Sequence, residues 1–299
     1  MALVTQWVTG PLFGLHRSAK IGLVLFLLVI FALSVVLTKS PMLPKSRVYE
    51  VFRELAKIQM QWKTRHWEQA ESAHFVVRYQ PADAGVASLV LQTAEQSYRP
   101  VADAYKFAKT EKSLVIIYPT REELGRSFGW AADESAMGVY WAGVIRVLSP
   151  RQWIDTDDPQ DMARVFAENG PMAHEFAHMV VDYRTDGNYT RWFTEGIAQY
   201  EEYRLTGFKL ENERELTADL LYPFAQMDRT FDDLPDQGRA YQQSLEAVNY
   251  LVEVYGRAKQ DEILDALAGG KTLNESFRSA LGVDLRQFEA DFRNWVAAK

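Results

Sequence analysis

The chain has 299 residues, of which 47% are hydrophobic, so it is long and apolar enough to form one or two buried cores. Its formal net charge is −7, which gives no indication of a nucleic-acid-binding surface. It contains no cysteine, and this excludes disulfides, thiol catalysis and cysteine-ligated metal sites.

Residues 21–38 form the most apolar stretch of the chain. They include no charged side chain, and Lys20 and Lys39 stand on either side of them. As a helix they would rise about 27 Å, close to the hydrocarbon thickness of a bilayer. A cleavable signal peptide is the alternative, but its apolar region is usually shorter, and no small-residue cleavage motif is clear here. We therefore predict an uncleaved, single-pass anchor in the cell membrane.

The orientation of this anchor is indicated by two opposing features. Basic residues precede the segment at Arg17 and Lys20, and others follow it at Lys39, Lys45 and Arg47, which leans towards a cytoplasmic C-terminus. First helices that follow a short basic N-terminus commonly act as export signals. We expect the rest of the chain to be extracytoplasmic.

After a short linker, residues 47–71 have the periodicity of an amphipathic helix. The apolar positions at helical spacing are Val48, Phe52, Leu55, Ile58 and Trp62. We expect this stripe to pack on the following domain as part of a stalk helix. Contact with a membrane surface is the alternative.

The next part of the chain alternates between strand and helix patterns. We predict strands at 74–79 and 114–118, separated by a long helix at 84–107. Thr120 is a good N-cap for a further helix, and residues 138–148 resemble a hairpin turning at Ala142 and Gly143. Residues 161–182 are expected to be a helical region that residues 169–171 break, with Pro171 at a helix start. Further helices are expected over residues 192–204, 212–227, 240–256, 258–268, 272–281 and 284–298.

Residues 174–178 read HEFAH, which is the H-E-x-x-H pattern of a zinc site with its own general base. On a helix His174 and His178 lie on one face and can bind one metal ion. Glu175 lies one step round the helix, within reach of a metal-bound water. The chain has only five histidines, so a chance match is improbable. The alternative is a buried helix with two hydrogen-bonded histidines.

A third ligand is needed, because a catalytic zinc usually has three protein ligands and one open position. No histidine follows His178, and the earlier ones lie far upstream, so a carboxylate is expected. Glu195 is the best candidate, since it stands near the start of a second helix after a turn at 185–188. Capping of that helix is the alternative role for Glu195. The other carboxylates within reach are Asp182, Asp186, Glu201 and Glu202.

Taken together, HEFAH and the segment WFTEGIAQY at 192–200 resemble the gluzincin zinc metalloproteases, most closely the peptidase MA-like family of bacterial metallohydrolases. In that family two helix histidines and a glutamate from a W-x-x-E-G-x-A-x-Y segment bind zinc. The resemblance implies His174, His178 and Glu195 as zinc ligands and Glu175 as the general base. The spacing of 17 positions between His178 and Glu195 is shorter than in the best-known gluzincin aminopeptidases. The resemblance covers about residues 72–298.

The resemblance also bears on the groups around the metal. Thermolysin-like enzymes hold the oxyanion with a downstream histidine, which this chain lacks. A similar tyrosine-containing helix entry in the family implies Tyr241 as the donor, whereas a plain packing role is the alternative for one of 14 tyrosines. Gln199 and Asp182 each lie one turn after a ligand and are candidates for hydrogen bonds to the histidines, although some gluzincins carry an aspartate at the Gln199 position. An ordinary solvated acid is the alternative for Asp182.

We therefore predict an α+β protein with a thermolysin- or gluzincin-like catalytic domain at 72–299. This domain would have an N-terminal mixed-sheet subdomain and a C-terminal helical subdomain. Residues 1–20 would be an N-terminal tail, 21–38 the transmembrane signal anchor, and 39–71 a linker with a juxtamembrane helix.

The predicted function is that of a membrane-anchored zinc metallopeptidase that hydrolyses peptide or protein substrates with a zinc-bound water activated by Glu175. An endopeptidase is favoured, because no motif for binding a substrate N-terminus is recognised. The hairpin at 138–148 is a candidate edge for pairing with substrate, with ordinary sheet structure as the alternative. Two further alternatives are a catalytically silent zinc-containing binding or assembly module and a metal-free helical domain. Zinc is inferred from the ligand types, which also suit iron.

Overall fold

The computed structural model describes residues 45–129, 136–209 and 215–299. Residues 46–299 form one compact unit, so the helix that follows the linker belongs to it. Across the described residues, no helix combines the length and apolar character needed to span a bilayer. The predicted anchor at 21–38 lies outside the described residues.

A five-stranded mixed sheet forms the N-terminal part of this unit, as predicted. The strand order is β1-β2-β3-β5-β4, in which β2, β3 and β5 run parallel and the two edge strands run antiparallel to their neighbours. The strands are β1 (Glu68–Glu71), β2 (Phe75–Tyr79), β3 (Ser113–Tyr118), β4 (Gly138–Trp141) and β5 (Val144–Leu148). The second edge, β4, is the strand that lies next to the metal helix described below.

Helices cover both faces of the sheet, and the central strand β3 shows how the sequence specifies this. Its six residues are all buried, as expected for a parallel strand covered on both faces. Val115 and Ile117 point into the main core, which includes α3 (Ala84–Ala104) and α6 (Met172–Thr185). Leu114 and Ile116 point to the opposite face, where α2 (Lys45–Lys63) and α4 (Arg121–Phe128) pack.

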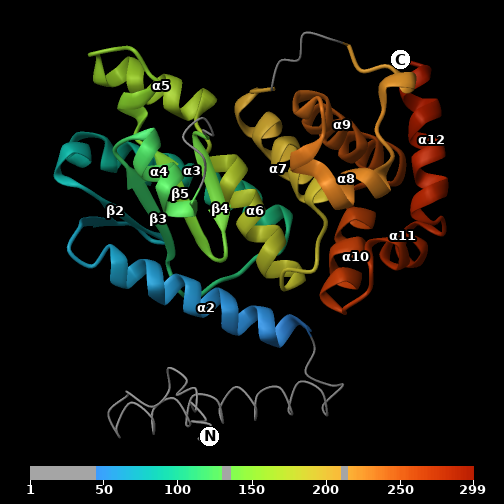
Figure 1. The fold of residues 1–299 in the computed structure, drawn as a ribbon, viewed down its shortest axis with the longest axis horizontal. Helices are drawn as coiled ribbons and strands as arrows, with labels where there is room; N and C mark the ends of the chain where they lie inside the picture. The colour runs from blue at the N-terminus through green and yellow to red at the C-terminus, as the bar shows by residue number, and fades with distance from the viewer. Residues whose placement is uncertain (1–44, 130–135, 210–214) are drawn as a thin grey trace, which may run out of the picture. The chain divides into compact units, whose positions relative to one another are not determined.

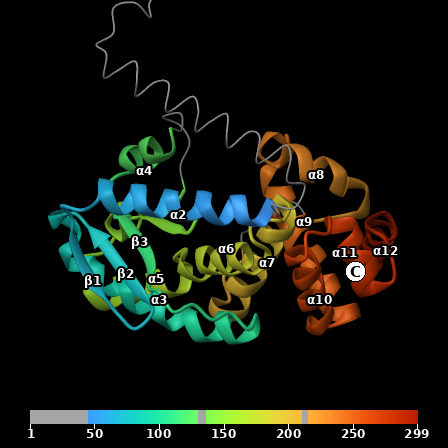
Figure 2. The same ribbon diagram turned by 90° about the horizontal axis from the view of Figure 1, so that it is seen from below.

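The rest of the unit is helical, and Figures 1 and 2 show α6 and α7 lying between the sheet and the C-terminal helices. Besides α6, the helices that follow the sheet in the chain are α5 (Pro159–Asn169), α7 (Arg191–Thr206), α8 (Phe224–Thr230), α9 (Gln237–Tyr250), α10 (Arg257–Ala268), α11 (Leu273–Leu281) and α12 (Leu285–Ala297). The chain continues from α9 through one π-helical turn at Leu251–Tyr255.

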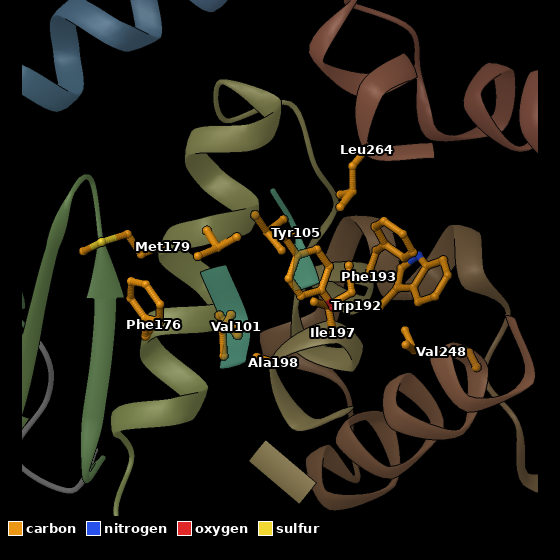
Figure 3. Close-up of a cluster of buried hydrophobic side chains, with 14 of the residues drawn as sticks. Val101, Tyr105, Phe176, Met179, Trp192, Phe193, Ile197, Ala198, Val248 and Leu264 are labelled. Carbon is orange, nitrogen blue, oxygen red and sulfur yellow. The ribbon is translucent and has the colours of Figure 1, made fainter. Parts of the chain in front are cut away.

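One continuous core joins the two parts of the unit (Figure 3). Phe176 and Met179 of α6 contribute to it on the sheet side, and Phe193 and Ile197 of α7 on the side of α9 and α10. All four side chains are fully buried. The two helices that carry the candidate metal ligands are therefore both packed into this core, which fixes their relative position.

Two predicted elements differ from the structure. The helix predicted at 47–71 ends at Lys63, where Thr64 turns the chain by bonding back to Met60, and Glu68–Glu71 instead forms β1 by pairing with β2. The helix predicted at 212–227 is described only from 215, and its regular part begins at Phe224. Pro223 explains this late start, because a proline disfavours helical geometry in the residue before it.

Candidate metal centre

The first part of the site is the paired histidines of α6. Pro171 stands immediately before the helix, whose first turn contains His174, and His178 follows one turn later. Their Nε2 atoms lie 3.1 Å apart. Most of the other side chains of α6 are also buried, so the helix cannot rotate and move the two rings without disrupting the core.

Helix α7 supplies the third group. Glu195 Oε2 lies 3.4 Å from His174 Nε2 and 3.5 Å from His178 Nε2. This oxygen is buried and accepts no hydrogen bond from the described residues. Since α7 begins at Arg191, Glu195 stands in its second turn and does not cap the helix. A buried carboxylate oxygen without a protein hydrogen-bond partner, beside two imidazole nitrogens, fits a metal ligand.

The separations between these three atoms fit a tetrahedral zinc. Ligand atoms about 2.0–2.1 Å from a tetrahedral ion lie about 3.3–3.4 Å from one another. The three separations in the structure are 3.1, 3.4 and 3.5 Å, all within about 0.2 Å of that range, and His174, His178 and Glu195 form a group able to hold a metal ion. The structure therefore selects Glu195 among the carboxylates that the sequence left open.

The other carboxylates near these helices have different partners. Glu201 accepts from Tyr105 and Arg204 and pairs with Arg257, away from the histidines. Asp186 lies 3.6 Å from the guanidinium of Arg53.

The second ring nitrogen of each histidine has a partner that the sequence analysis did not identify. His174 Nδ1 lies 3.1 Å from a Glu202 carboxylate oxygen, and His178 Nδ1 lies 2.8 Å from the Thr194 hydroxyl. A proton held on each Nδ1 leaves the Nε2 lone pair for the metal. The sequence could have indicated Glu202, because it follows the expected ligand Glu195 by two helical turns and therefore lies on the same face of α7.

Gln199 and Asp182 do not take the roles predicted for them. The Gln199 amide donates to the Tyr241 carbonyl. Asp182 is fully buried and accepts hydrogen bonds from Tyr49 and Tyr140, while Arg53 pairs with it at 3.2 Å. The carboxylate therefore ties α6 to α2 and β4 instead of orienting a metal ligand.

Arg191 balances the charge at the centre. Its guanidinium lies 2.8 Å from Glu195 Oε1, the oxygen that does not face the histidines. Burial disfavours ionisation of Glu195, but His178 and Arg191 outweigh it and hold the pKa of this carboxyl well below its ordinary value. Burial lowers the pKa of His178, whereas burial at His174 is outweighed by Glu202 and Glu195, which raise its pKa.

Glu175 lies beside the three ligand residues without joining them. One of its oxygens accepts a hydrogen bond from the backbone N–H of Tyr140 at 2.5 Å, so the edge strand β4 holds the carboxylate in place. Burial raises the pKa of Glu175 to about 7, although His174 opposes the shift. The approach of strand and helix is close, because a Cβ at Gly138 would meet Pro171 at 2.6 Å and the Glu175 side chain at 2.9 Å.

The metal-binding group, Glu175 and Arg191 line one cavity of about 660 Å³. Its wall includes the ligand residues, Glu175 and Arg191, the strand residues 138–140, and Tyr241 from α9. Tyr241 packs edge-on against Phe231, and burial raises the pKa of its hydroxyl. The residues that line this cavity thus combine a metal-binding group, a carboxylate that is not a ligand, a tyrosine hydroxyl and the edge strand β4.

Comparison with known proteins gives a match for the C-terminal part of the chain. Residues 161–298, which contain every residue of the metal group, match the Peptidase MA superfamily. The match covers a little less than half of the chain. No curated protein matches the chain. Among solved structures, a mutant M1 zinc metallopeptidase from Deinococcus radiodurans is similar at 17% identity, over 77% of this chain and 50% of that chain, with a TM-score of 0.39. The chain thus spans about half the length of that protein.

The match of this segment to the Peptidase MA superfamily agrees with the resemblance drawn from HEFAH and WFTEGIAQY. Together, the superfamily and the His-His-Glu donor set imply zinc as the metal. They support a zinc metallopeptidase.

Proposed function

We propose that this protein is a membrane-anchored zinc endopeptidase in which Glu175 is the general base. The observation that carries the proposal is the unligated carboxylate of Glu175 in the same cavity as the three ligand atoms. A structural zinc site has four protein ligands and no use for such a group, whereas a catalytic site needs it.

When bound, zinc polarises the substrate carbonyl and makes water more acidic. The chain's own residues supply the rest. Glu175 accepts the proton of the attacking water and passes it to the leaving amine, while the Tyr140 N–H keeps the carboxylate oriented. Arg191 compensates the charge of Glu195. The Tyr241 hydroxyl donates a hydrogen bond to the oxyanion, a role supported by its place in the cavity wall.

Substrate binding by strand addition is supported by the position of β4. It is an edge strand, and its outer backbone groups at Gly138 and Tyr140 face away from β5 towards the cavity. The Tyr140 N–H is donated to Glu175, which leaves the Tyr140 carbonyl and the backbone of Gly138 for substrate. An extended peptide can pair there through its main chain. This mode of binding uses the interior of a polypeptide, which favours an endopeptidase.

The anchor is the segment 21–38, and we place the protein as a single-pass protein of the cell membrane with its catalytic domain outside the cytoplasm. The support is the sequence alone, namely the uncharged apolar run and its basic flanks.

The test uses the full-length chain with zinc and quenched-fluorescent peptides blocked at both ends. Cleavage is expected, and Glu175→Gln should lower kcat by about 10²–10⁴-fold while keeping its zinc. Glu168→Gln, at an exposed position of α5, is the matched control and should behave as the parent. Activity that survives Glu175→Gln would refute the mechanism.

The same assay, run in parallel on peptides with a free N-terminus, separates the alternatives. A parent chain that binds zinc but cleaves none of the peptides would favour the silent binding or assembly module. Cleavage only of peptides with a free N-terminus would indicate an aminopeptidase, in which Asp232 and Asp233 of the cavity wall would be candidates to bind the substrate amine.

A further inference from the structure

Helix α2 packs on the domain with a mixed face, in which the charged residues Arg53 and Lys57 are buried beside Ala56 and Met60. Arg53 and Lys57 are 4% and 5% exposed, and both carry buried charge on the side turned towards the domain. The opposite side of the helix is apolar and faces outward. This is the reverse of the arrangement expected for a helix that only covers a protein core.

The outward side forms a continuous apolar stripe. Its members recur three or four residues apart, which places them on one face along the whole helix. They are between 44% and 64% exposed: Val48, Val51, Phe52, Leu55, Ile58 and Trp62. Trp141, at the end of β4, extends the stripe by packing edge-on against Phe52 and is itself 44% exposed.

We propose that this apolar stripe lies on the surface of a lipid bilayer, with α2 in the plane of the headgroups. The inference rests on the membrane anchor proposed above and is independent of the peptidase activity. The uncharged segment ends at Thr38, and α2 begins at Lys45. Seven residues of extended chain span at most about 25 Å, so an anchored chain keeps α2 beside the membrane.

The charges around the stripe also fit a lipid surface. Without Arg53 and Lys57, which face the domain, the stretch from Lys39 to Arg65 still contains five basic and two acidic residues in a chain whose net charge is −7. Lys63 and Arg65 are exposed at the end of the helix, where Arg65 stacks on Trp62 at 4.2 Å. Basic residues beside an apolar face with tryptophan are the composition of interfacial helices on anionic lipid.

Two residues of α2 link the proposed membrane contact to the helix that carries the metal ligands. Tyr49 and Arg53 both hold Asp182, which stands on α6 one turn after His178. A membrane-bound α2 is thereby fixed to the helix that carries the metal ligands. The bilayer would then orient the catalytic domain, and the domain would not swing freely on its linker.

The absence of cysteine allows a direct test on the full chain. One cysteine is introduced in place of Leu55, which is 60% exposed, and labelled with an environment-sensitive fluorophore. The control carries its cysteine in place of Gln160, exposed on α5, which Figure 1 shows on the opposite side of the domain from α2. Both proteins are reconstituted in vesicles of phosphatidylethanolamine and phosphatidylglycerol, and zinc content checks that each is folded.

Flotation of both proteins with the vesicles reports the anchor. The label at position 55 should be quenched severalfold more by brominated lipid than by aqueous iodide, and the label at 160 should show the reverse. Iodide quenching at 55 equal to that at 160 would overturn the docking and leave the anchor standing. Shielding of position 55 from both quenchers would mean that protein covers the stripe, which also overturns it. Failure to float would refute the anchor and the docking together, and the proposed peptidase would be unaffected.

Discussion

Gly196 stands next to the ligand Glu195 at the closest contact between α7 and α9. A Cβ added there would lie 2.2 Å from the Ser244 carbonyl oxygen and 2.7 Å from a methyl carbon of Val248. An ordinary carbon–oxygen contact is about 3.2–3.4 Å, so Gly196→Ala requires the helices to separate by about 1 Å. The carbonyl oxygen belongs to the backbone of α9 and cannot swing aside as a side chain does.

Two opposing effects decide the outcome. Alanine favours a helix over glycine by about 0.5–1 kcal/mol, whereas overpacking a filled core costs about 1–3 kcal/mol. We expect Gly196→Ala to be less stable than the parent by about 1–2 kcal/mol. A shift of about 1 Å in Glu195 should lower kcat/KM by about 10²-fold, beyond what the loss of stability explains.

The assay is urea unfolding together with zinc content and kcat/KM for each protein. Gly269→Ala is the matched control, because the backbone there is right-handed and the nearest atom to an added Cβ is a carbonyl oxygen at 3.3 Å. It should change the free energy of unfolding by less than about 0.5 kcal/mol. A Gly196→Ala protein at least as stable as the parent, with unchanged activity, would refute the reasoning about this contact.

Three further predictions concern the surroundings of the site. Arg53→Met breaks a buried ion pair with Asp182, whose side chains are 5% and 0% exposed, and should lower the free energy of unfolding by about 3 kcal/mol in urea titrations. The double variant with Asp182→Asn should recover part of that loss, and no recovery would contradict the pairing. Thr194→Val and Glu202→Gln should each weaken zinc binding about 10–100-fold in competition with a chelator, and unchanged affinity would remove their assigned role. Burial lowers the pKa of Lys109 to about 8, so folding disfavours its charged form, and the parent should gain stability relative to Lys109→Met as the pH rises from 8 to about 10.4, its unfolded value. Parallel stability curves for the two proteins across that range would contradict this.

The helices of the metal centre could be predicted because their signals are local. The spacing of His174 and His178 specifies one helical face, and the turn after α6 separates it from the helix carrying Glu195. The bonds of Thr194 and Glu202 to the histidines were missed, because they depend on how α7 is rotated against α6. That rotation is fixed by packing between distant residues, which periodicity along one helix does not contain.

Helix α2 shows a second limit of periodicity. The positions of the stripe were predicted, but its packing on the domain was wrong, since the helix packs through Arg53 and Lys57 and exposes the stripe. Helices that pack on a protein core and helices that lie on a lipid surface both have an apolar face in their sequence, so this pattern does not distinguish the two. Strand β1 was missed for a related reason, because Glu68–Glu71 has a polar sequence and becomes a strand only by pairing with β2.

The central claim is a three-ligand zinc site served by a separate general base. The most direct measurement is the zinc content of the full-length chain, purified without a histidine tag, beside His174→Ala, Glu195→Ala and Glu175→Gln. The account predicts about one zinc per chain in the parent and in Glu175→Gln, and loss of zinc in both ligand variants. Absence of zinc from the folded parent, or its retention when Glu195 is replaced, would contradict the account.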